Sequence, residues 1–188
     1  MVQDGRMEIV KIILLCVVAA CVYGILHDMV TAQVCVEYFT IGHRPIFGGV
    51  RSPILLALGW GVIATWWVGL PLGIMAALAA RVGRSFKLKA RQLVRPMGIL
   101  LAIMGSMALM AGIAGYVLAR LDVVRLTGWT ASRVPQDRHW AFIADLWAHL
   151  ASYASGVLGG LVFCVGIILW RIMLRRVAAG PADSKACC

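Results

Sequence analysis

The sequence predicts an all-α integral membrane protein, a bundle of four membrane-spanning helices with both termini in the cytoplasm. Two observations predict this class. Hydrophobic residues make up 62% of the 188 residues and charged residues only 14%, a balance that soluble domains of this length do not carry. The apolar residues also gather in four long runs, at 9–26, 54–80, 96–119 and 150–174.

Each run is long enough to cross a bilayer, whose hydrocarbon core requires about 20 residues of helix. Apart from Lys11 near one end and Arg171 near the other, the runs contain no Asp, Glu, Lys, Arg or His. A helix satisfies its own backbone hydrogen bonds in lipid, so each run is predicted to be a spanning helix. We therefore expect a single membrane domain over 1–188.

The first run is predicted to be a retained span. The residues from Val18 to Cys21 resemble a bacterial lipoprotein cleavage box, but the chain after Cys21 stays apolar, where a lipoprotein turns polar. The terminal pair Cys187 and Cys188 resembles an acylation or prenylation tail. We interpret this pair as an ordinary chain end.

The Lys and Arg residues of the connections predict the orientation, because cytoplasmic loops carry the excess of positive charge. The amino end, the second connection and the carboxyl end together hold twelve of them: Arg6, Lys11, Arg81, Arg84, Lys87, Lys89, Arg91, Arg95, Arg171, Arg175, Arg176 and Lys185. The first and third connections hold six: Arg44, Arg51, Arg120, Arg125, Arg133 and Arg138. The loops 27–53 and 120–149 are therefore expected outside the cytoplasm, and the predicted location is the bacterial cytoplasmic (inner) membrane.

The first outer loop, residues 27–53, is long for a connection between adjacent helices, and connections of this length are usually functional or disordered. Its aromatic and β-branched residues argue against disorder. We expect it to fold over the bundle mouth as an extracytoplasmic cap, with Gly42, Gly48 and Gly49 permitting turns. In the second outer loop, Pro135 and Asp137 predict the start of the last helix.

Three strings in this chain carry a family resemblance. They are His27-Asp28 with Val30-Thr31, then Glu37-Tyr-Phe-Thr-Ile-Gly-His43, and later the stretch from Asp145 to Tyr153. The chain resembles a group of bacterial four-span membrane proteins over most of its length. The resemblance implies the four-span fold, and it implies no activity and no catalytic residue.

All four histidines fall on the predicted outer side: His27, His43, His139 and His149. Small residues mark the helix faces that pack against neighbours in a membrane, and Ser152, Gly156 and Gly160 form such a row. At helical spacing this row continues to His149 and Asp145. The row through Gly24 likewise reaches His27 and Asp28. Both pairs are expected to point into the outer mouth of the bundle.

Imidazole and carboxylate groups in one place suit a divalent transition metal such as Zn, Fe, Mn or Cu. The candidate metal ligands are His27, Asp28, Glu37, Asp145 and His149. The candidate catalytic residues are Glu37, Asp145 and His149. A purely structural interpretation competes with this one, in which His27 and Asp28 cap the first helix. In this interpretation Glu37 pairs with Arg44 or Arg51, and Asp145 pairs with Arg138 or a loop amide.

Three classes of function remain open. The first is metal-dependent or acid/base chemistry at the outer leaflet on a lipid, a quinone-like molecule or a lipid-linked group. The second is a non-catalytic subunit or assembly factor that binds a membrane protein through its cap. The third is a single-haem protein, in which histidines from two spans ligate the iron. Transport is disfavoured because the span centres carry no charge, and the net charge of +10 calls for anionic lipid rather than nucleic acid.

Overall fold

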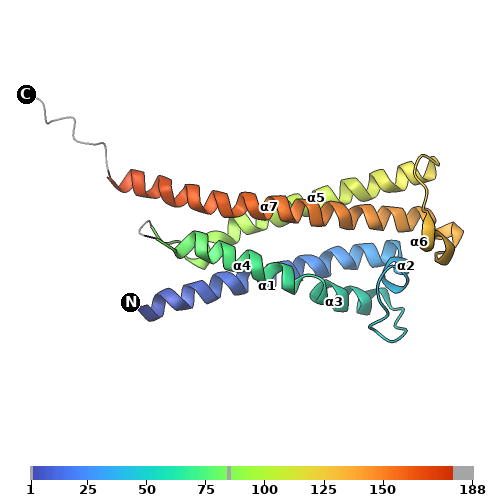
Figure 1. Ribbon diagram of the computed structural model, residues 1–188, viewed down its shortest axis with the longest axis horizontal. Helices are drawn as coiled ribbons and strands as arrows, with labels where there is room; N and C mark the ends of the chain where they lie inside the picture. The colour runs from blue at the N-terminus through green and yellow to red at the C-terminus, as the bar shows by residue number, and fades with distance from the viewer. Residues whose placement is uncertain (1, 84–85, 180–188) are drawn as a thin grey trace, which may run out of the picture.

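The computed structural model describes residues 2–83 and 86–179, and all regular structure in these ranges is helical. The elements are α1 (Val2–Val34), α2 (Val36–Thr40), α3 (Pro53–Ile63), α4 (Trp66–Arg81), α5 (Ala90–Arg120), α6 (Gly128–Arg133), the 3-10 helix η1 (Gln136–Arg138) and α7 (His139–Ala179) (Figure 1). Arg84, Lys185, Cys187 and Cys188 lie outside the described residues.

Four helical stretches are long and apolar enough to cross a membrane: Gly5–Val34, Pro53–Arg81, Ala90–Arg120 and Gln136–Ala178. Each contains one of the four apolar runs, so the predicted all-helical membrane fold is confirmed. The helices are longer than the runs because polar residues continue them at both ends. The last one begins with η1 directly after Pro135, where the sequence predicts its start.

The second span is not one continuous helix. It is divided at Ala64 and Thr65 into α3 and α4. The Thr65 hydroxyl donates a hydrogen bond back to the Gly61 carbonyl, a contact that bends helices. Pro71 inside α4 removes a further backbone donor. Hydropathy alone does not register either effect, which explains why the sequence predicts an unbroken span.

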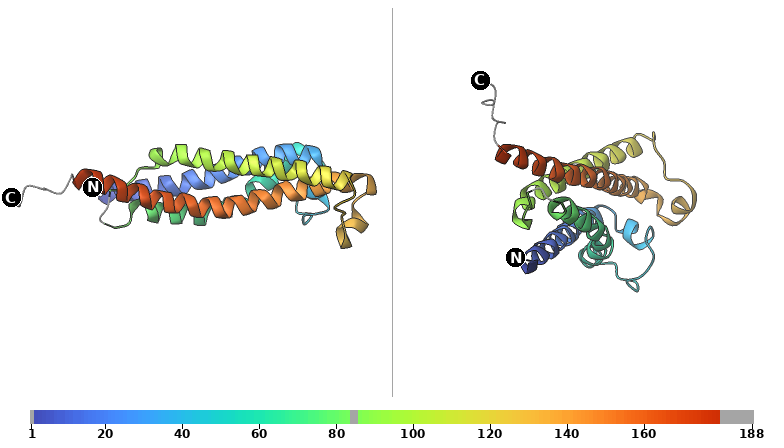
Figure 2. Two further views of the ribbon diagram at one scale, coloured as in Figure 1. Left: turned by 90° about the horizontal axis from the view of Figure 1, so that it is seen from above. Right: turned by 60° about the vertical axis from the view of Figure 1, so that its left-hand side comes forward.

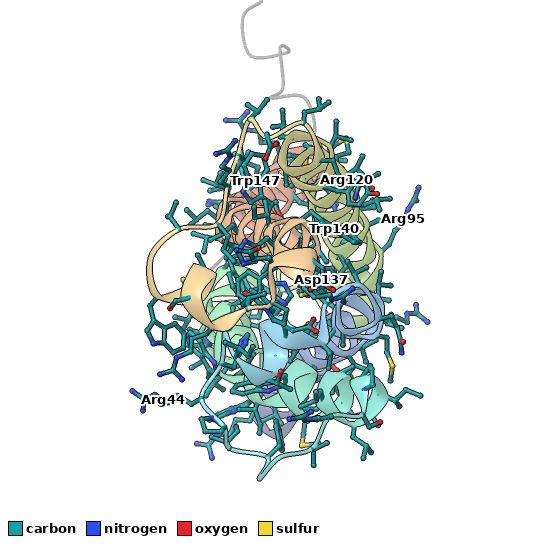
Figure 3. The ribbon with its side chains drawn as sticks, turned by 90° about the vertical axis from the view of Figure 1, so that its right-hand side faces the viewer. Arg44, Arg95, Arg120, Asp137, Trp140 and Trp147 are labelled. Carbon is teal, nitrogen blue, oxygen red and sulfur yellow. The ribbon has the colours of Figure 1, made fainter. Side chains whose placement is uncertain are left out.

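The four spans pack as two antiparallel pairs (Figures 1 and 2). In one pair α1 packs against the second span, formed by α3 and α4, and in the other α5 packs against α7. The start of α1 and the end of α7 lie at one end of the bundle, which we call the terminal end. The helices α2 and α6 lie at the opposite end, the loop end. Figure 3 looks onto the loop end, where Arg44 points away from the bundle.

Glycines let α1 approach its partners closely. A Cβ at Gly61 would overlap the backbone of Gly24 and Ile25, and one at Gly69 would overlap the backbone of α1 near Cys16. Where lipid provides no hydrophobic drive, this close backbone packing is what associates spanning helices. It fixes the part of α1 that carries His27 and Asp28.

Two apolar clusters hold the bundle together, one toward each end. The first includes Ile12, Leu93 and Phe163 near the terminal end, and the second includes Phe39 and Phe142 near the loop end. Between them lies a polar layer of buried side chains: Asp28, Thr31, Asp145, His149 and Ser152. The polar residues predicted to share the small-residue face of the last helix are therefore buried.

The connection between the first two spans is shorter than the predicted loop 27–53. The reason is that α1 continues past the end of the apolar run to Val34, so residues 27–34 are helical. The remaining residues, 35–52, include α2, whose Tyr38 and Phe39 are buried. Gly48 and Gly49 have φ of 53° and 87°, which confirms the predicted turns there. At Gly42 the constraint is space, since a Cβ would overlap the Tyr38 carbonyl.

At the terminal end, Arg171 of α7 lies folded into the protein with 6% of its surface exposed. Its guanidinium donates hydrogen bonds to one backbone carbonyl in the last turn of α4, that of Ala79, and to two in the α4–α5 connection, those of Val82 at 2.7 Å and Phe86 at 2.6 Å. Glu8 of α1 accepts a bond from the backbone N–H of Ala90 at 3.0 Å. These two side chains tie α1 and α7 to the connection between α4 and α5.

Candidate functional site

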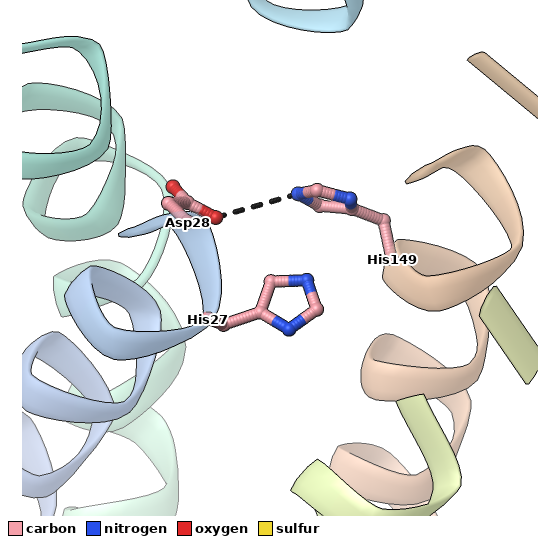
Figure 4. A group of neighbouring side chains, drawn as sticks. All are labelled: His27, Asp28 and His149. Carbon is pink, nitrogen blue, oxygen red and sulfur yellow. Dashed lines mark ion pairs between the residues drawn. The ribbon is translucent and has the colours of Figure 1, made fainter. Parts of the chain in front are cut away.

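Four of the predicted site residues meet in the polar layer. His27 and Asp28 come from α1, and Asp145 and His149 come from α7. Asp28, Asp145 and His149 are buried, with 5%, 1% and 4% of their surfaces exposed. Figure 4 shows the imidazoles of His27 and His149 extending toward each other from the two helices, with Asp28 beside His149. The two ring planes are nearly perpendicular, at 80°.

The hydrogen-bond geometry around His149 fixes its orientation. Its Nδ1 lies 3.0 Å from the backbone carbonyl oxygen of Asp145 and 2.8 Å from Oδ1 of the same residue. Both neighbours are acceptors, so Nδ1 carries a hydrogen and donates it to the carbonyl. In the neutral ring Nε2 then holds the lone pair. This atom faces Asp28 Oδ1 at 3.4 Å.

No Lys or Arg of the described residues forms an ion pair with the two carboxylates of the cluster. Among the residues that the structure describes, His149 is the only ion-pair partner of Asp28 and of Asp145. Oδ2 of Asp145 and Nε2 of His27 are buried without a hydrogen-bond partner, while Oδ1 of Asp145 lies 2.8 Å from His149 Nδ1. Two carboxylates in a low-dielectric layer require compensation. A proton on His149 supplies one positive charge, and a divalent cation supplies two.

The geometry around His27, Asp28 and His149 suits a metal ion. Each offers one ligand atom, and these atoms lie within 4.8 Å of one another. Two ligand atoms bound at about 2.0–2.2 Å to a tetrahedral ion lie roughly 3.4 Å apart, which is the separation of His149 Nε2 and Asp28 Oδ1. A charge-assisted hydrogen bond would be shorter, at about 2.7–2.9 Å.

A small enclosed cavity adjoins these three side chains. Its volume is about 30 Å³, enough for one water molecule or ion. Its wall is formed by His27, Asp28 and His149 together with aromatic residues that include Trp60 and Tyr153. Two imidazoles and one carboxylate around such a space match the three-ligand sets of catalytic metal sites, which leave one position open.

Glu37 is not brought into this cluster. Its Oε2 accepts hydrogen bonds from Arg138 Nε at 3.2 Å and from the Cys35 thiol at 3.4 Å. Burial alone would raise the pKa of Glu37, but bonds from its own backbone, from Cys35 and from Arg138 outweigh burial and hold the pKa below its usual range. The partner of Glu37 is therefore Arg138 rather than Arg44 or Arg51, and Asp145 contacts His149 rather than Arg138.

The Glu37–Arg138 pair predicts that the stability of the 35–52 connection depends on pH. Since the folded-state pKa of Glu37 lies below the unfolded one, the pair stabilises residues 35–52 above about pH 4.3. That stabilisation is lost as the pH falls through the folded-state pKa. In Glu37→Gln we expect amide hydrogen exchange of this segment at pH 7 to be about two- to fivefold faster, the effect of a pair contributing up to ~1 kcal/mol.

The matched control for this experiment is Asp122→Asn, which breaks the exposed ion pair with Arg125 at 3.4 Å. It should leave exchange of residues 35–52 unchanged. The difference between Glu37→Gln and the parent protein should shrink as the pH is lowered through the folded-state pKa of Glu37. A difference that stays constant with pH would show that the carboxylate charge does not hold the connection.

The other histidines and the loop cysteine lie around the site. His43 is packed between aromatic rings, 4.4 Å from the Trp60 centroid, and burial lowers its pKa. It is therefore a wall of the small cavity rather than a solvated surface residue. His139 lies outside the cluster, with Nε2 3.0 Å from the Val134 carbonyl. Burial raises the pKa of Cys35 to about 12, which removes this thiol from the candidate nucleophiles.

Two tyrosines of the site, Tyr23 and Tyr153, were missed by reasoning from the sequence, and Ser152 was recognised only as a small packing residue. The Tyr23 hydroxyl lies 2.8 Å from Ser152 Oγ, a contact that joins α1 to α7 directly below the cluster. Tyr153 lines the small cavity. The spacing carried a signal for Tyr23, which precedes His27 by four residues and so shares its helix face.

Comparisons of the chain with protein-family models, with curated proteins and with solved structures gave no match. The resemblance to bacterial four-span proteins therefore stays a prediction. Function has to be inferred from the geometry of the cluster.

Proposed function

We propose that the protein holds a divalent metal ion between His27, Asp28 and His149 and uses it in hydrolytic or acid/base chemistry on a membrane-associated substrate. The observation that carries this proposal is the separation of 3.4 Å between His149 Nε2 and Asp28 Oδ1, with the unpartnered Nε2 of His27 beside them. Zn, Fe, Mn and Cu all accept this ligand set.

The side chains of the cluster have distinct tasks in this proposal. His27, Asp28 and His149 bind the ion. The backbone carbonyl of Asp145 fixes the tautomer of His149. The side-chain carboxylate of Asp145 lies next to Nδ1 of the same ring, the nitrogen that does not bind the metal, an arrangement common at metal-ligating histidines. A divalent metal in such a site supplies Lewis-acid polarisation of a substrate oxygen and activates water near neutral pH. Asp145 also has one free oxygen, Oδ2, with which to accept a proton or a hydrogen bond from the substrate.

The proposal includes the orientation. With the positively charged connection in the cytoplasm, the loop end and the cluster face the extracytoplasmic side of the bacterial inner membrane. The 35–52 connection then forms a cap over the cluster, because Phe39 and His43 wall the small cavity.

Metal analysis of purified protein tests the proposal. After purification without chelators, we expect about one transition-metal ion per chain by inductively coupled plasma mass spectrometry. His27→Ala and His149→Ala should each reduce metal affinity by more than the roughly 10–100-fold that outer-shell changes cost. The matched control is His139→Ala, which removes an imidazole of the same end of the protein that bonds only to a backbone carbonyl.

Metal loss in His139→Ala equal to that in His149→Ala would point to general unfolding and contradict a specific site. Wild-type protein without metal, including after reconstitution with each of the four metals, would also contradict the proposal.

A second candidate rests on the carboxylates on both sides of the His149 ring. In a metal-free protein, protonated His149 between Asp28 and Asp145 would serve as a general acid/base. Activity that persists in His27→Ala but is lost in His149→Ala would favour it, since only His149 touches both carboxylates.

A further inference from the structure

A long groove runs along the bundle between α1, α5 and α7. Its volume is about 680 Å³, within the range of about 300–1,000 Å³ typical of small-molecule pockets. On α1 it extends from Val22 to Val34, a length of about 18 Å at the rise of an α-helix. This length corresponds to one leaflet, about half of a hydrocarbon core of ~30 Å.

The groove opens sideways, toward lipid. Its rim includes Leu26 and Val30 of α1 and Leu109 and Ile113 of α5, all more than half exposed. All four lie inside the helical stretches that span the membrane. A molecule dissolved in the bilayer can therefore enter without passing through water.

Small residues on α5 create the depth of the groove. Ala102, Gly105, Ala108 and Gly112 line it. A Cβ at Gly105 would meet only the Tyr23 ring, at 3.9 Å. The space at Gly105 is therefore open. Gly61 differs, because the space beside it is filled by the backbone of a neighbouring helix.

The bottom of the groove is polar at one place. His27 and Asp145 both line it. Asp145 Oδ2 has no hydrogen-bond partner, while Asp145 Oδ1 lies 2.8 Å from His149 Nδ1 and His27 Nε2 belongs to the proposed metal site. Asp145 is 99% buried, with 1% of its surface exposed. An apolar chain alone would leave Asp145 Oδ2 unsatisfied. The backbone of a neighbouring protein helix would too, because its N–H groups are already bonded within the helix.

We infer that the groove binds one hydrocarbon chain of a membrane lipid whose hydrogen-bond-donating head group meets Asp145 beside His27. The inference rests on the proposed function, for which it names the substrate class: a long-chain lipid with a hydroxyl or a protonated phosphate near the end of the chain. The head group lies beside the cluster, so His27 faces the substrate on one side and the small cavity on the other.

Photo-crosslinking with a diazirine-bearing hexadecanol tests this inference. In protein reconstituted into phosphatidylcholine vesicles, peptides covering residues 22–34 and 101–116 should be labelled saturably, and unlabelled hexadecanol should compete. Gly105→Leu fills the groove and should reduce this labelling about tenfold, a mid-range overpacking effect. Ala102→Leu, also in the groove, provides a second blocking variant.

The matched control is Gly98→Leu on the same helix, where a Cβ meets nothing within 4 Å; it should leave the labelling unchanged. Labelling spread evenly over the lipid-facing helices, without competition, would overturn the inference as contact with bulk lipid. Cross-links from the groove to a second copy or another protein would also overturn it.

Metal content measured on the same samples separates the two proposals. Gly105→Leu should keep its metal, because Gly105 lies below the ligands. Bound metal without saturable labelling would overturn the groove and leave the metal site standing. Saturable labelling of protein without metal would support the groove and overturn the metal-dependent function.

Discussion

Arg171→Met should lower the free energy of unfolding by about 3–5 kcal/mol, because three carbonyls lose their donor. Each hydrogen bond from a charged group contributes about 1.5–3 kcal/mol, and the bonds of one guanidinium add up to less than their sum because they share one side chain. Methionine keeps much of the length of the side chain and removes every donor. The carbonyls of Ala79, Val82 and Phe86 lie at and after the end of α4. There the helix leaves acceptors unsatisfied and favours a cation. The measurement is unfolding of the purified protein in detergent.

Arg175→Met is the matched control, because Arg175 lies one turn further along α7 and is exposed. It should change the unfolding free energy by less than ~0.5 kcal/mol. Arg171→Lys should fall between the two, since an ammonium group lacks the planar fork of donors. Equal stability of Arg171→Met and Arg175→Met would mean that water or other groups satisfy the three carbonyls.

The four-span fold could be predicted because one physical requirement dominates it. A chain segment in hydrocarbon must be apolar, and about 20 residues of helix are needed to cross. The apolar runs meet both conditions. The role of Arg171 could not be predicted in this way. Charge counting treats an arginine near the membrane surface the same whether it faces lipid head groups or bonds to backbone carbonyls near the α4–α5 connection.

Part of the site could be predicted from the spacing of residues along one helix. The spacing of Asp145 and His149 by four residues predicts that they share a helix face, and their burial agrees with the small-residue row. The contact of His149 with Asp28 depends on how α1 and α7 pack, which a single sequence does not specify. The extension of α1 to Val34 was missed as well, since polar residues such as His27 and Asp28 end an apolar run without ending a helix.

The ion-pair partner of Glu37 could not be predicted from the sequence either. Its charge and its position in the first connection made it a candidate ligand, but six arginines were available on the same side as partners. Arg138 is 101 residues away in sequence, and it also bonds to the Val34 carbonyl at 2.8 Å. Pair choice at such separation is a property of the tertiary fold.

Asp145→Asn should weaken metal binding about 10–100-fold, the usual cost of losing a carboxylate behind a metal-ligating histidine. The substitution keeps the shape of the side chain and removes its charge. Metal affinity is measured by competition with a chelator of known strength. Asp137→Asn is the matched control, because Asp137 lies exposed at the start of the same helical stretch, and it should leave the affinity unchanged.

The same variant should leave the stability of the metal-free protein unchanged or raise it. Asp28 and Asp145 share His149 as their only ion-pair partner among the described residues, so without a metal ion the second buried carboxylate is a cost. An Asp145 that served only to hold the bundle together would give the opposite pair of results. Its loss would lower stability by about 1–3 kcal/mol, the cost of a missing buried hydrogen bond, and metal affinity would not change. The sign of the stability change in metal-free protein therefore distinguishes a residue that tunes a metal site from one that supports the fold.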